Sequence, residues 1–139
     1  MKGILLISHG PLAQGMYETT KWFMGEDIPQ YDYLALLPED SPERFDAKLA
    51  EKIDLLDSGE GVIVIADLMG GTPCNRASFA IANGNVDLLT GMNLALVLQL
   101  LGNRLSDNYD IEALVETGKQ GVLHVNALFA QAQDDADDE

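Results

Sequence analysis

Two short segments of this sequence carry side chains that could transfer a phosphoryl group. One is Ser8-His9-Gly10-Pro11, and the other runs over residues 67–75 with the sequence Asp-Leu-Met-Gly-Gly-Thr-Pro-Cys-Asn. An imidazole is largely uncharged near neutral pH, so one of its nitrogens can attack phosphorus. A carboxylate that accepts a hydrogen bond from the other nitrogen holds the ring in the reactive tautomer. His9 and Asp67 are therefore the candidate catalytic residues.

The same segments contain groups that could bind the phosphate itself. Glycines let backbone N–H groups approach an anion closely, and a helix N-terminus favours negative charge. We predict that Gly10, Gly70, Gly71 and Thr72 are phosphate-binding residues, with a helix beginning at Thr72-Pro73. Apart from Arg76, the two segments contain no lysine or arginine. Neutral donors suit a protein that holds a phosphoryl group only long enough to pass it on.

Apolar runs and helical repeats indicate the elements that must position these segments. Gly3–Ser8 and Gly61–Ala66 are continuous apolar runs, which predict buried parallel strands. Further strands are predicted at Tyr31–Leu37, Val86–Thr90 and Gly121–Val125, and helices at Pro11–Met24, Ser41–Leu56, Thr72–Ala82, Leu94–Leu101 and Ile111–Thr117. The helix Leu94–Leu101 is apolar almost all round, so we expect it to be buried or to lie in a subunit interface.

This alternation predicts an α/β fold with a doubly wound, mostly parallel open sheet and helices on both faces. Ligands of such sheets bind beyond the carboxyl ends of the strands, where the strand order reverses. In a flavodoxin-like order that point lies between the first and third strands. We therefore expect His9 and Asp67 to face each other there.

Composition narrows the classes of function. The 139 residues fit one domain, and the net charge of -15 argues against nucleic acid and anionic lipid as partners. Two histidines and one cysteine give no metal-ligand pattern, and we expect no metal and no cofactor. One cysteine and no long apolar run indicate a cytoplasmic protein. We divide the chain into a domain over residues 1–130 and an acidic, disordered tail over residues 131–139.

Four motifs in order resemble the enzyme IIA family of the mannose/fructose/sorbose-type sugar phosphotransferase systems. They are His9-Gly10 after the first strand, Asp-x-x-Gly-Gly-Thr-Pro-x-Asn over residues 67–75, Thr-Gly-Met-Asn over 90–93 and Val-Glu-Thr-Gly-Lys-Gln-Gly over 115–121. The resemblance covers nearly the whole chain apart from the acidic tail. It implies a phosphotransferase with a phosphohistidine intermediate.

The resemblance also implies partners and an assembly. His9 would accept a phosphoryl group from phospho-HPr and pass it to a IIB component, and from there to a sugar entering through the membrane components IIC and IID. Asp67 would be the partner of the histidine, and Thr72 would contact the phosphate. The family further implies a homodimer that exchanges a C-terminal antiparallel strand.

Other classes of phosphate-handling protein are alternatives to this family. Histidine phosphatases carry an arginine directly before the histidine, where this chain has Ser8. Receiver domains need clustered acidic residues after the first strand, which Ser8-His9-Gly10 lacks. A regulatory phosphohistidine module and the phosphocarrier subunit of a dihydroxyacetone kinase remain alternatives.

Overall fold

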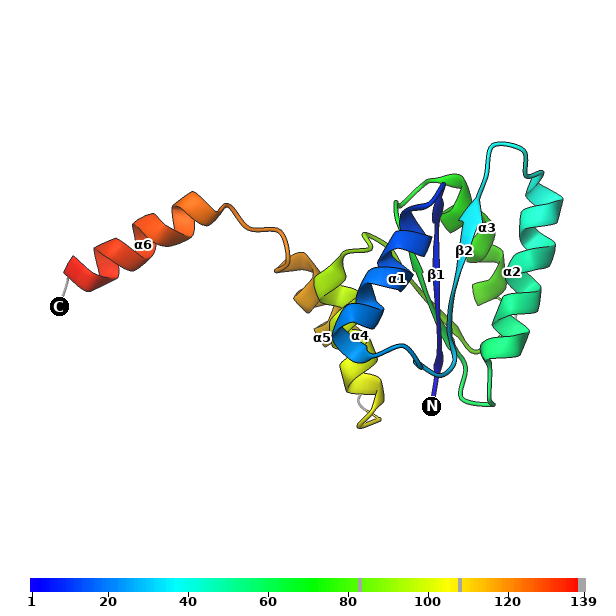
Figure 1. Cartoon of the computed structure of the whole chain (residues 1–139). Helices are drawn as coiled ribbons and strands as arrows, with labels where there is room; N and C mark the ends of the chain where they lie inside the picture. The colour runs from blue at the N-terminus through cyan, green and yellow to red at the C-terminus, as the bar shows by residue number, and fades with distance from the viewer. Residues whose placement is uncertain (83, 108, 138–139) are drawn as a thin grey trace.

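A computed structural model of the chain describes residues 1–82, 84–107 and 109–137 (Figure 1). Four strands form one sheet in the order β2-β1-β3-β4, and every neighbouring pair is parallel. This order confirms the predicted doubly wound sheet. The strands are β1 (Gly3–His9), β2 (Tyr31–Leu36), β3 (Val62–Ala66) and β4 (Val86–Leu89).

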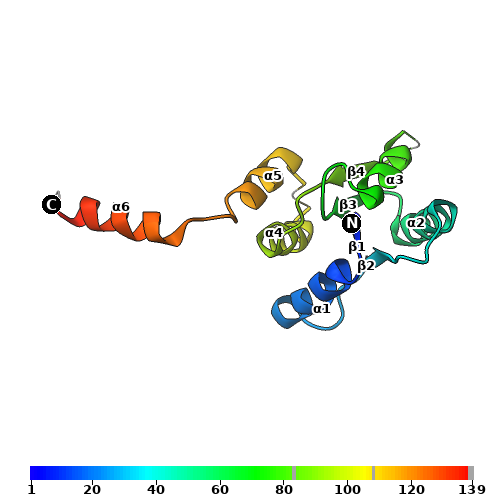
Figure 2. The same ribbon diagram turned by 90° about the horizontal axis from the view of Figure 1, so that it is seen from above.

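Helices cover both faces of the sheet. The helices are α1 (Leu12–Met24), α2 (Pro42–Leu56), α3 (Thr72–Ile81), α4 (Leu94–Arg104), α5 (Ile111–Lys119) and α6 (Val125–Asp137). Viewed from above, α1 and α4 lie on one side of the strands and α2 and α3 on the other (Figure 2). None of the helices in the described part of the chain is long and apolar enough to cross a membrane.

The strands are apolar along their whole length because both faces of the sheet are covered. Side chains alternate between the two faces of a strand. Ile4 and Leu6 of β1 pack in the core beneath α1 and α4, and Leu5 and Ile7 pack in the core beneath α2 and α3. The register of β1 and β3 pairs Ile7 with Ala66. The residues that follow these two strands therefore emerge side by side at one edge of the sheet.

Helix α4 is fixed at both ends by polar contacts. Asn93 caps it, with Oδ1 accepting the N–H of Leu96 at 2.9 Å. At the other end the buried guanidinium of Arg104 donates hydrogen bonds to three backbone carbonyls, at Lys2, Pro29 and Gln30. Four apolar residues of α4 are buried between its ends, Leu96, Val97, Leu100 and Leu101, and burial is one of the two outcomes that its composition predicts.

The C-terminal region differs from the sequence-based expectation. The predicted strand over Gly121–Val125 is wrong for this chain: residues 122–124 have no regular structure and α6 begins at Val125. A strand needs a neighbour to share its hydrogen bonds, and none is beside this segment, so the exchanged strand stays a prediction about a dimer. Residues 131–137, expected to be disordered, form the end of α6, whose alanines and glutamines favour a helix. Residues 138–139 lie outside the described part of the chain.

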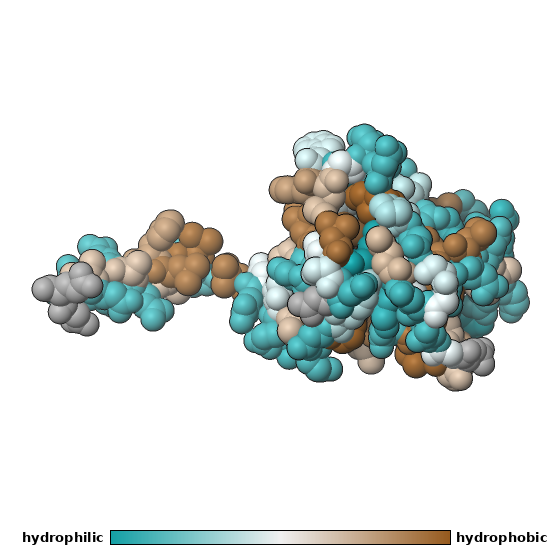
Figure 3. All heavy atoms as spheres, turned by 90° about the horizontal axis from the view of Figure 1, so that it is seen from below, coloured by the Kyte–Doolittle hydropathy of each residue, from teal (hydrophilic) through white to brown (hydrophobic). Residues whose placement is uncertain are grey.

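Helix α6 stands away from the rest of the molecule (Figure 1). None of its described residues is buried, and Phe129 is 72% exposed. Apolar atoms gather on this helix in the surface view (Figure 3). An isolated helix of this length is only marginally stable in water, and exposed apolar surface of this kind is typical of contact sites.

Candidate functional site

His9 and Asp67 meet at the carboxyl edge of the sheet. His9 is the last residue of β1, and Asp67 directly follows β3, the neighbouring strand. The Oδ2 atom of Asp67 lies 2.8 Å from Nδ1 of His9 and also accepts the backbone N–H of His9 at 3.0 Å. The expected proximity is therefore present. Two hydrogen bonds to one oxygen hold both the backbone and the ring of His9.

This geometry selects one tautomer of the ring. A carboxylate can only accept a hydrogen bond, so Nδ1 carries the proton and Nε2 keeps its lone pair. The side chain of His9 is 48% exposed, whereas that of Asp67 is 10% exposed. The nucleophilic nitrogen can thus be reached from solvent while the carboxylate is shielded.

The other oxygen of Asp67 has an uncommon environment. Oδ1 is buried and has no hydrogen-bond partner among the described residues. This oxygen is poorly compensated, because it has lost water without gaining a donor. A positive charge on the neighbouring ring would offset this cost. The pair is therefore suited to stabilise an imidazole ring that becomes cationic when it is phosphorylated.

Gly71 lies directly against the histidine ring. A Cβ atom built on Gly71 would be 2.5 Å from Cε1 of His9 and 3.2 Å from Nε2. Its backbone φ is not in the left-handed region, so the need for glycine comes from this close approach. The residue caps α3 without a side chain, and its N–H donates to the carbonyl of Leu68 at 3.3 Å. The absence of a side chain at position 71 makes room for the ring.

Gly71→Ala is expected to push the ring of His9 out of line with Asp67. We expect His9 to react with a phosphoryl donor about 10- to 100-fold more slowly, because a displacement of about 1 Å is enough for such a loss. The rate of phosphorylation, followed by intact mass, measures the effect. Gly102→Ala is the matched control, since a Cβ there would meet nothing within 4 Å. A wild-type rate in Gly71→Ala would show that the ring tolerates the added methyl group.

The other predicted phosphate-binding residues lie at the same edge, and their polar groups make different hydrogen bonds. The N–H of Gly10 donates to the carbonyl of Leu36 at 2.9 Å, so it extends the sheet. Gly70 has a φ of +82°, which favours glycine, and its carbonyl accepts from the side chain of Asn75 at 3.2 Å. The hydroxyl of Thr72 has no hydrogen-bond partner among the described residues and lies in the first turn of α3. The Thr72 hydroxyl can therefore donate to an anion at this edge of the sheet.

Ser8 has a role that the sequence reasoning missed. Its side chain is buried, and Oγ accepts the N–H of Ala13 at 2.7 Å while donating to the carbonyl of Gly10 at 3.1 Å. Helix α1 has Pro11 at its N-cap, which cannot supply a capping side chain. The hydroxyl of Ser8, a residue of β1, acts as the missing cap. It also connects the turn that contains His9 to the helix. A serine shortly before a Gly-Pro helix start was the available signal.

Arg76 and Cys74, two residues near the site, have structural roles. Arg76 forms a salt bridge with Asp46 of α2, with Nε at 2.8 Å from Oδ1, and this hydrogen bond lowers the pKa of Asp46. Arg76 therefore links α2 to α3. Cys74 is buried in the core beneath those helices. Within the described ranges, no group of three or more His, Cys, Asp or Glu side chains could hold a metal ion.

The sequence matches one family over most of its length. Residues 3–118 match the family described as "PTS system fructose IIA component". Among curated proteins, the chain is 27% identical over 128 residues to the "PTS system mannose-specific EIIAB component" of Escherichia coli strain K12. That match covers 89% of this chain and 39% of the relative. The chain thus spans about two fifths of the length of the curated relatives it matches.

Solved structures show the same likeness. The IIA protein associated with the fucose utilization operon of Streptococcus pneumoniae superposes with a TM-score of 0.84 at 32% identity, covering 92% of this chain and 96% of that one. The mannose/sorbose-specific IIA subunit of Enterococcus faecalis gives 0.76 at 28% identity, covering 89% and 95%. The resemblance therefore extends through the elements that carry His9 and Asp67.

Proposed function

Since this chain belongs to the family of fructose- and mannose-type IIA components of the sugar phosphotransferase systems, we propose that it carries a phosphoryl group on His9. The donor is phospho-HPr and the acceptor is a IIB component, which serves the membrane components IIC and IID. This phosphoryl exchange takes place in the cytoplasm.

One observation carries this proposal: the half-exposed ring of His9 has Nδ1 at 2.8 Å from the shielded carboxylate of Asp67. The lone pair of Nε2 attacks the phosphorus of the donor phosphohistidine, and a new N–P bond forms as the old one breaks. The bonding electrons of the old bond return to the donor's imidazole. The proton on Nδ1 stays in its hydrogen bond to Asp67, which stabilises the cationic ring. Transfer to IIB repeats the exchange with His9 as the leaving group.

The test is an intact-mass measurement after incubation with phosphoenolpyruvate, enzyme I and HPr. We expect a gain of one phosphoryl group that disappears after mild acid, because a phosphohistidine is acid-labile. A known IIA protein in the same mixture serves as the control for donor activity. No gain on this chain while the control protein is phosphorylated would contradict the proposal.

We also propose that the protein works as a homodimer. The support is the exposed apolar surface of the C-terminal segment, including Val122, Leu123 and Phe129, each of which is at least 60% exposed. A monomer would leave this surface in water, at a cost that association removes. The segment follows α5 and stands away from the rest of the molecule (Figure 1).

Removing residues 122–139 is expected to convert the dimer to a monomer. The remaining domain should keep its melting temperature within about 2 °C at a concentration where both are monomeric, because α6 has no buried residues to lose. Light scattering measures the mass in solution. A chain that lacks only residues 131–139 is the matched control and should stay dimeric. A monomeric full-length chain, or a dimeric chain ending at Gly121, would refute the arrangement.

A further inference from the structure

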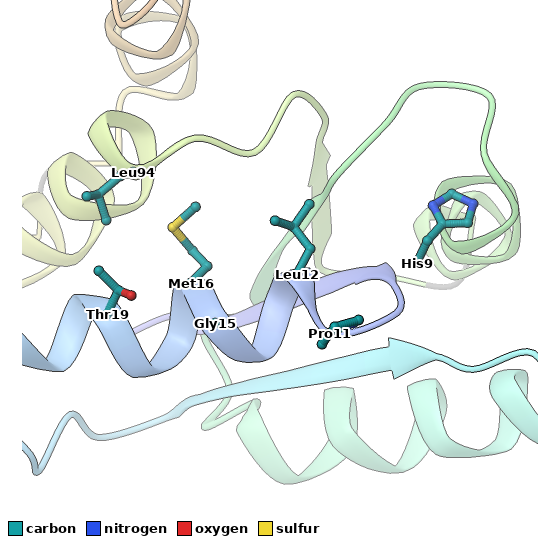
Figure 4. A pocket seen from close by; sticks show the side chains of 7 residues that line it. All are labelled: His9, Pro11, Leu12, Gly15, Met16, Thr19 and Leu94. Carbon is teal, nitrogen blue, oxygen red and sulfur yellow. The ribbon is translucent and has the colours of Figure 1, made fainter.

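The loop between β3 and α3, residues 67–71, shapes the space around the histidine ring. In Figure 4 the ring of His9 points away from the labelled side chains of α1 and toward this loop. The side chains in the middle of the loop do not anchor it, because Leu68 is 60% exposed and Met69 is 76% exposed. The path of the loop therefore depends on hydrogen bonds to its backbone.

Asn75, in the first turn of α3, holds both peptide groups that flank Gly71. Its side-chain Nδ2 donates to the carbonyl of Gly70 at 3.2 Å, and its backbone N–H donates to the carbonyl of Gly71 at 2.9 Å. The second bond is an ordinary helical one that any residue except proline would make, whereas the first needs the amide side chain. Among the described residues, no other side chain forms a hydrogen bond with residues 68–71.

The side-chain bond of Asn75 acts on the peptide group that lies against the ring. Gly70 has a φ of +82°, and the N–H of Gly71 donates to the carbonyl of Leu68 at 3.3 Å, so the loop makes a tight turn here. The carbonyl of Gly70 and the N–H of Gly71 belong to one planar peptide unit, so a bond to the first orients the second. A Cβ atom on Gly71 would be 2.5 Å from Cε1 of His9, so movement of this peptide is felt at the ring.

We propose, on the basis of the function proposed above, that Asn75 is a positioning residue for phosphoryl transfer. By holding the Gly70–Gly71 peptide, it keeps the ring of His9 in line with Asp67. Asn75 acts through this peptide and not on the phosphoryl group, because its amide donor is directed at the Gly70 carbonyl. Without that bond the turn moves relative to the ring, and a displacement of about 1 Å slows a positioned reaction by up to about 100-fold.

Asn75→Ala removes the bond to Gly70 and keeps the helix. We expect the limiting rate of His9 phosphorylation by phospho-HPr to fall about tenfold, while the concentration of phospho-HPr that half-saturates the reaction changes less than about twofold. Phosphoramidate, a small donor that needs no protein contact, should show the same loss, because the defect lies at the ring. The Cε1–H signal of His9 in the proton NMR spectrum should shift, whereas that of the exposed His124 should not.

Ser78→Ala is the matched control. Ser78 lies about one turn further along α3, and its hydroxyl donates to the carbonyl of Cys74 at 2.9 Å, so this variant also loses one bond from a side chain to the backbone. In both variants alanine offsets that loss by its helix propensity, so both should melt within about 3 °C of wild-type protein. Ser78→Ala should react normally. A limiting rate in Asn75→Ala equal to that of Ser78→Ala, with an unchanged Cε1–H signal, would overturn the proposal.

A double-variant cycle tests the route through Gly71. If Asn75 acts by placing Gly71, its loss matters less once that position is disturbed, so Asn75→Ala should slow Gly71→Ala by less than about threefold. A full additional loss in the Gly71→Ala background would show that the two residues act independently, which also contradicts the proposal. If wild-type protein takes no phosphoryl group from phospho-HPr, while the phosphoramidate rate and the NMR signal respond to Asn75→Ala, the proposed function fails and the positioning by Asn75 stands.

Discussion

His9→Ala is expected to abolish phosphoryl acceptance and to leave the fold intact. The substitution removes Nε2, the nitrogen whose lone pair would form the N–P bond, and no other described side chain near it has an equivalent nucleophile oriented by a carboxylate. The ring is half exposed, and among the described residues it hydrogen-bonds to Asp67 alone. Its loss therefore costs little packing. Intact mass before and after mild acid measures acceptance, and circular dichroism with a thermal scan measures the fold.

His124→Ala provides the matched control for this result. His124 is the second histidine of the chain, is exposed, and lies in the segment between α5 and α6. We expect the His124 variant to accept one phosphoryl group at the wild-type rate. An acid-labile gain that persists in His9→Ala and disappears in His124→Ala would move the acceptor to the C-terminal segment and refute the site described here.

Asp67→Ala is expected to slow phosphorylation of His9 by about 100-fold, the low end of what a positioned acid–base group contributes. The variant loses both hydrogen bonds to His9, at Nδ1 and at the backbone N–H. The ring can then rotate and exchange tautomers, and nothing compensates its positive charge. Single-turnover transfer from phospho-HPr, sampled by rapid quench, measures the rate.

Asp67→Asn separates the two contributions of this carboxylate. The amide oxygen can still accept the hydrogen bonds of Oδ2, but it has no charge to offset that of the phosphorylated ring. We therefore expect a phosphorylation rate between those of wild-type protein and Asp67→Ala. The lifetime of phospho-His9 should fall, while the orientation of the ring is largely kept. Asp87→Ala, which removes an aspartate on β4 bound to Lys2, is the control and should react normally. A wild-type rate in Asp67→Ala would mean that the ring needs no orientation by this residue.

The ring of His9 is held from two directions. Asp67 fixes Nδ1 from β3, and the space left by Gly71 admits the Cε1–Nε2 edge at the start of α3. Both residues belong to one loop, so the segment that orients the nucleophile also sets the room in which it reacts. A change in the path of this loop would alter orientation and access together.

Sequence alone determined the sheet and the pairing of the two main site residues. Continuous apolar runs such as residues 61–66 indicate strands covered on both faces, and alternating strands and helices favour a parallel order. In the flavodoxin-like order the first and third strands are neighbours and end at the same edge, which predicts that His9 and Asp67 come together. Ser41 and Asn93 are of residue types that favour helix starts for an equally local reason, and both cap their helices in the structure.

Tertiary structure decided the features that depend on distances between separate segments. The closeness of Gly71 to the His9 ring and the capping of α1 by Ser8 each require atoms from different elements to be placed within a few ångströms. A pattern of residue types reports which face a side chain occupies but not how far it stands from a side chain on another element. The structure after Gly121 differs from the sequence-based prediction for the same reason. A strand forms there only if a neighbouring strand is present to share its hydrogen bonds.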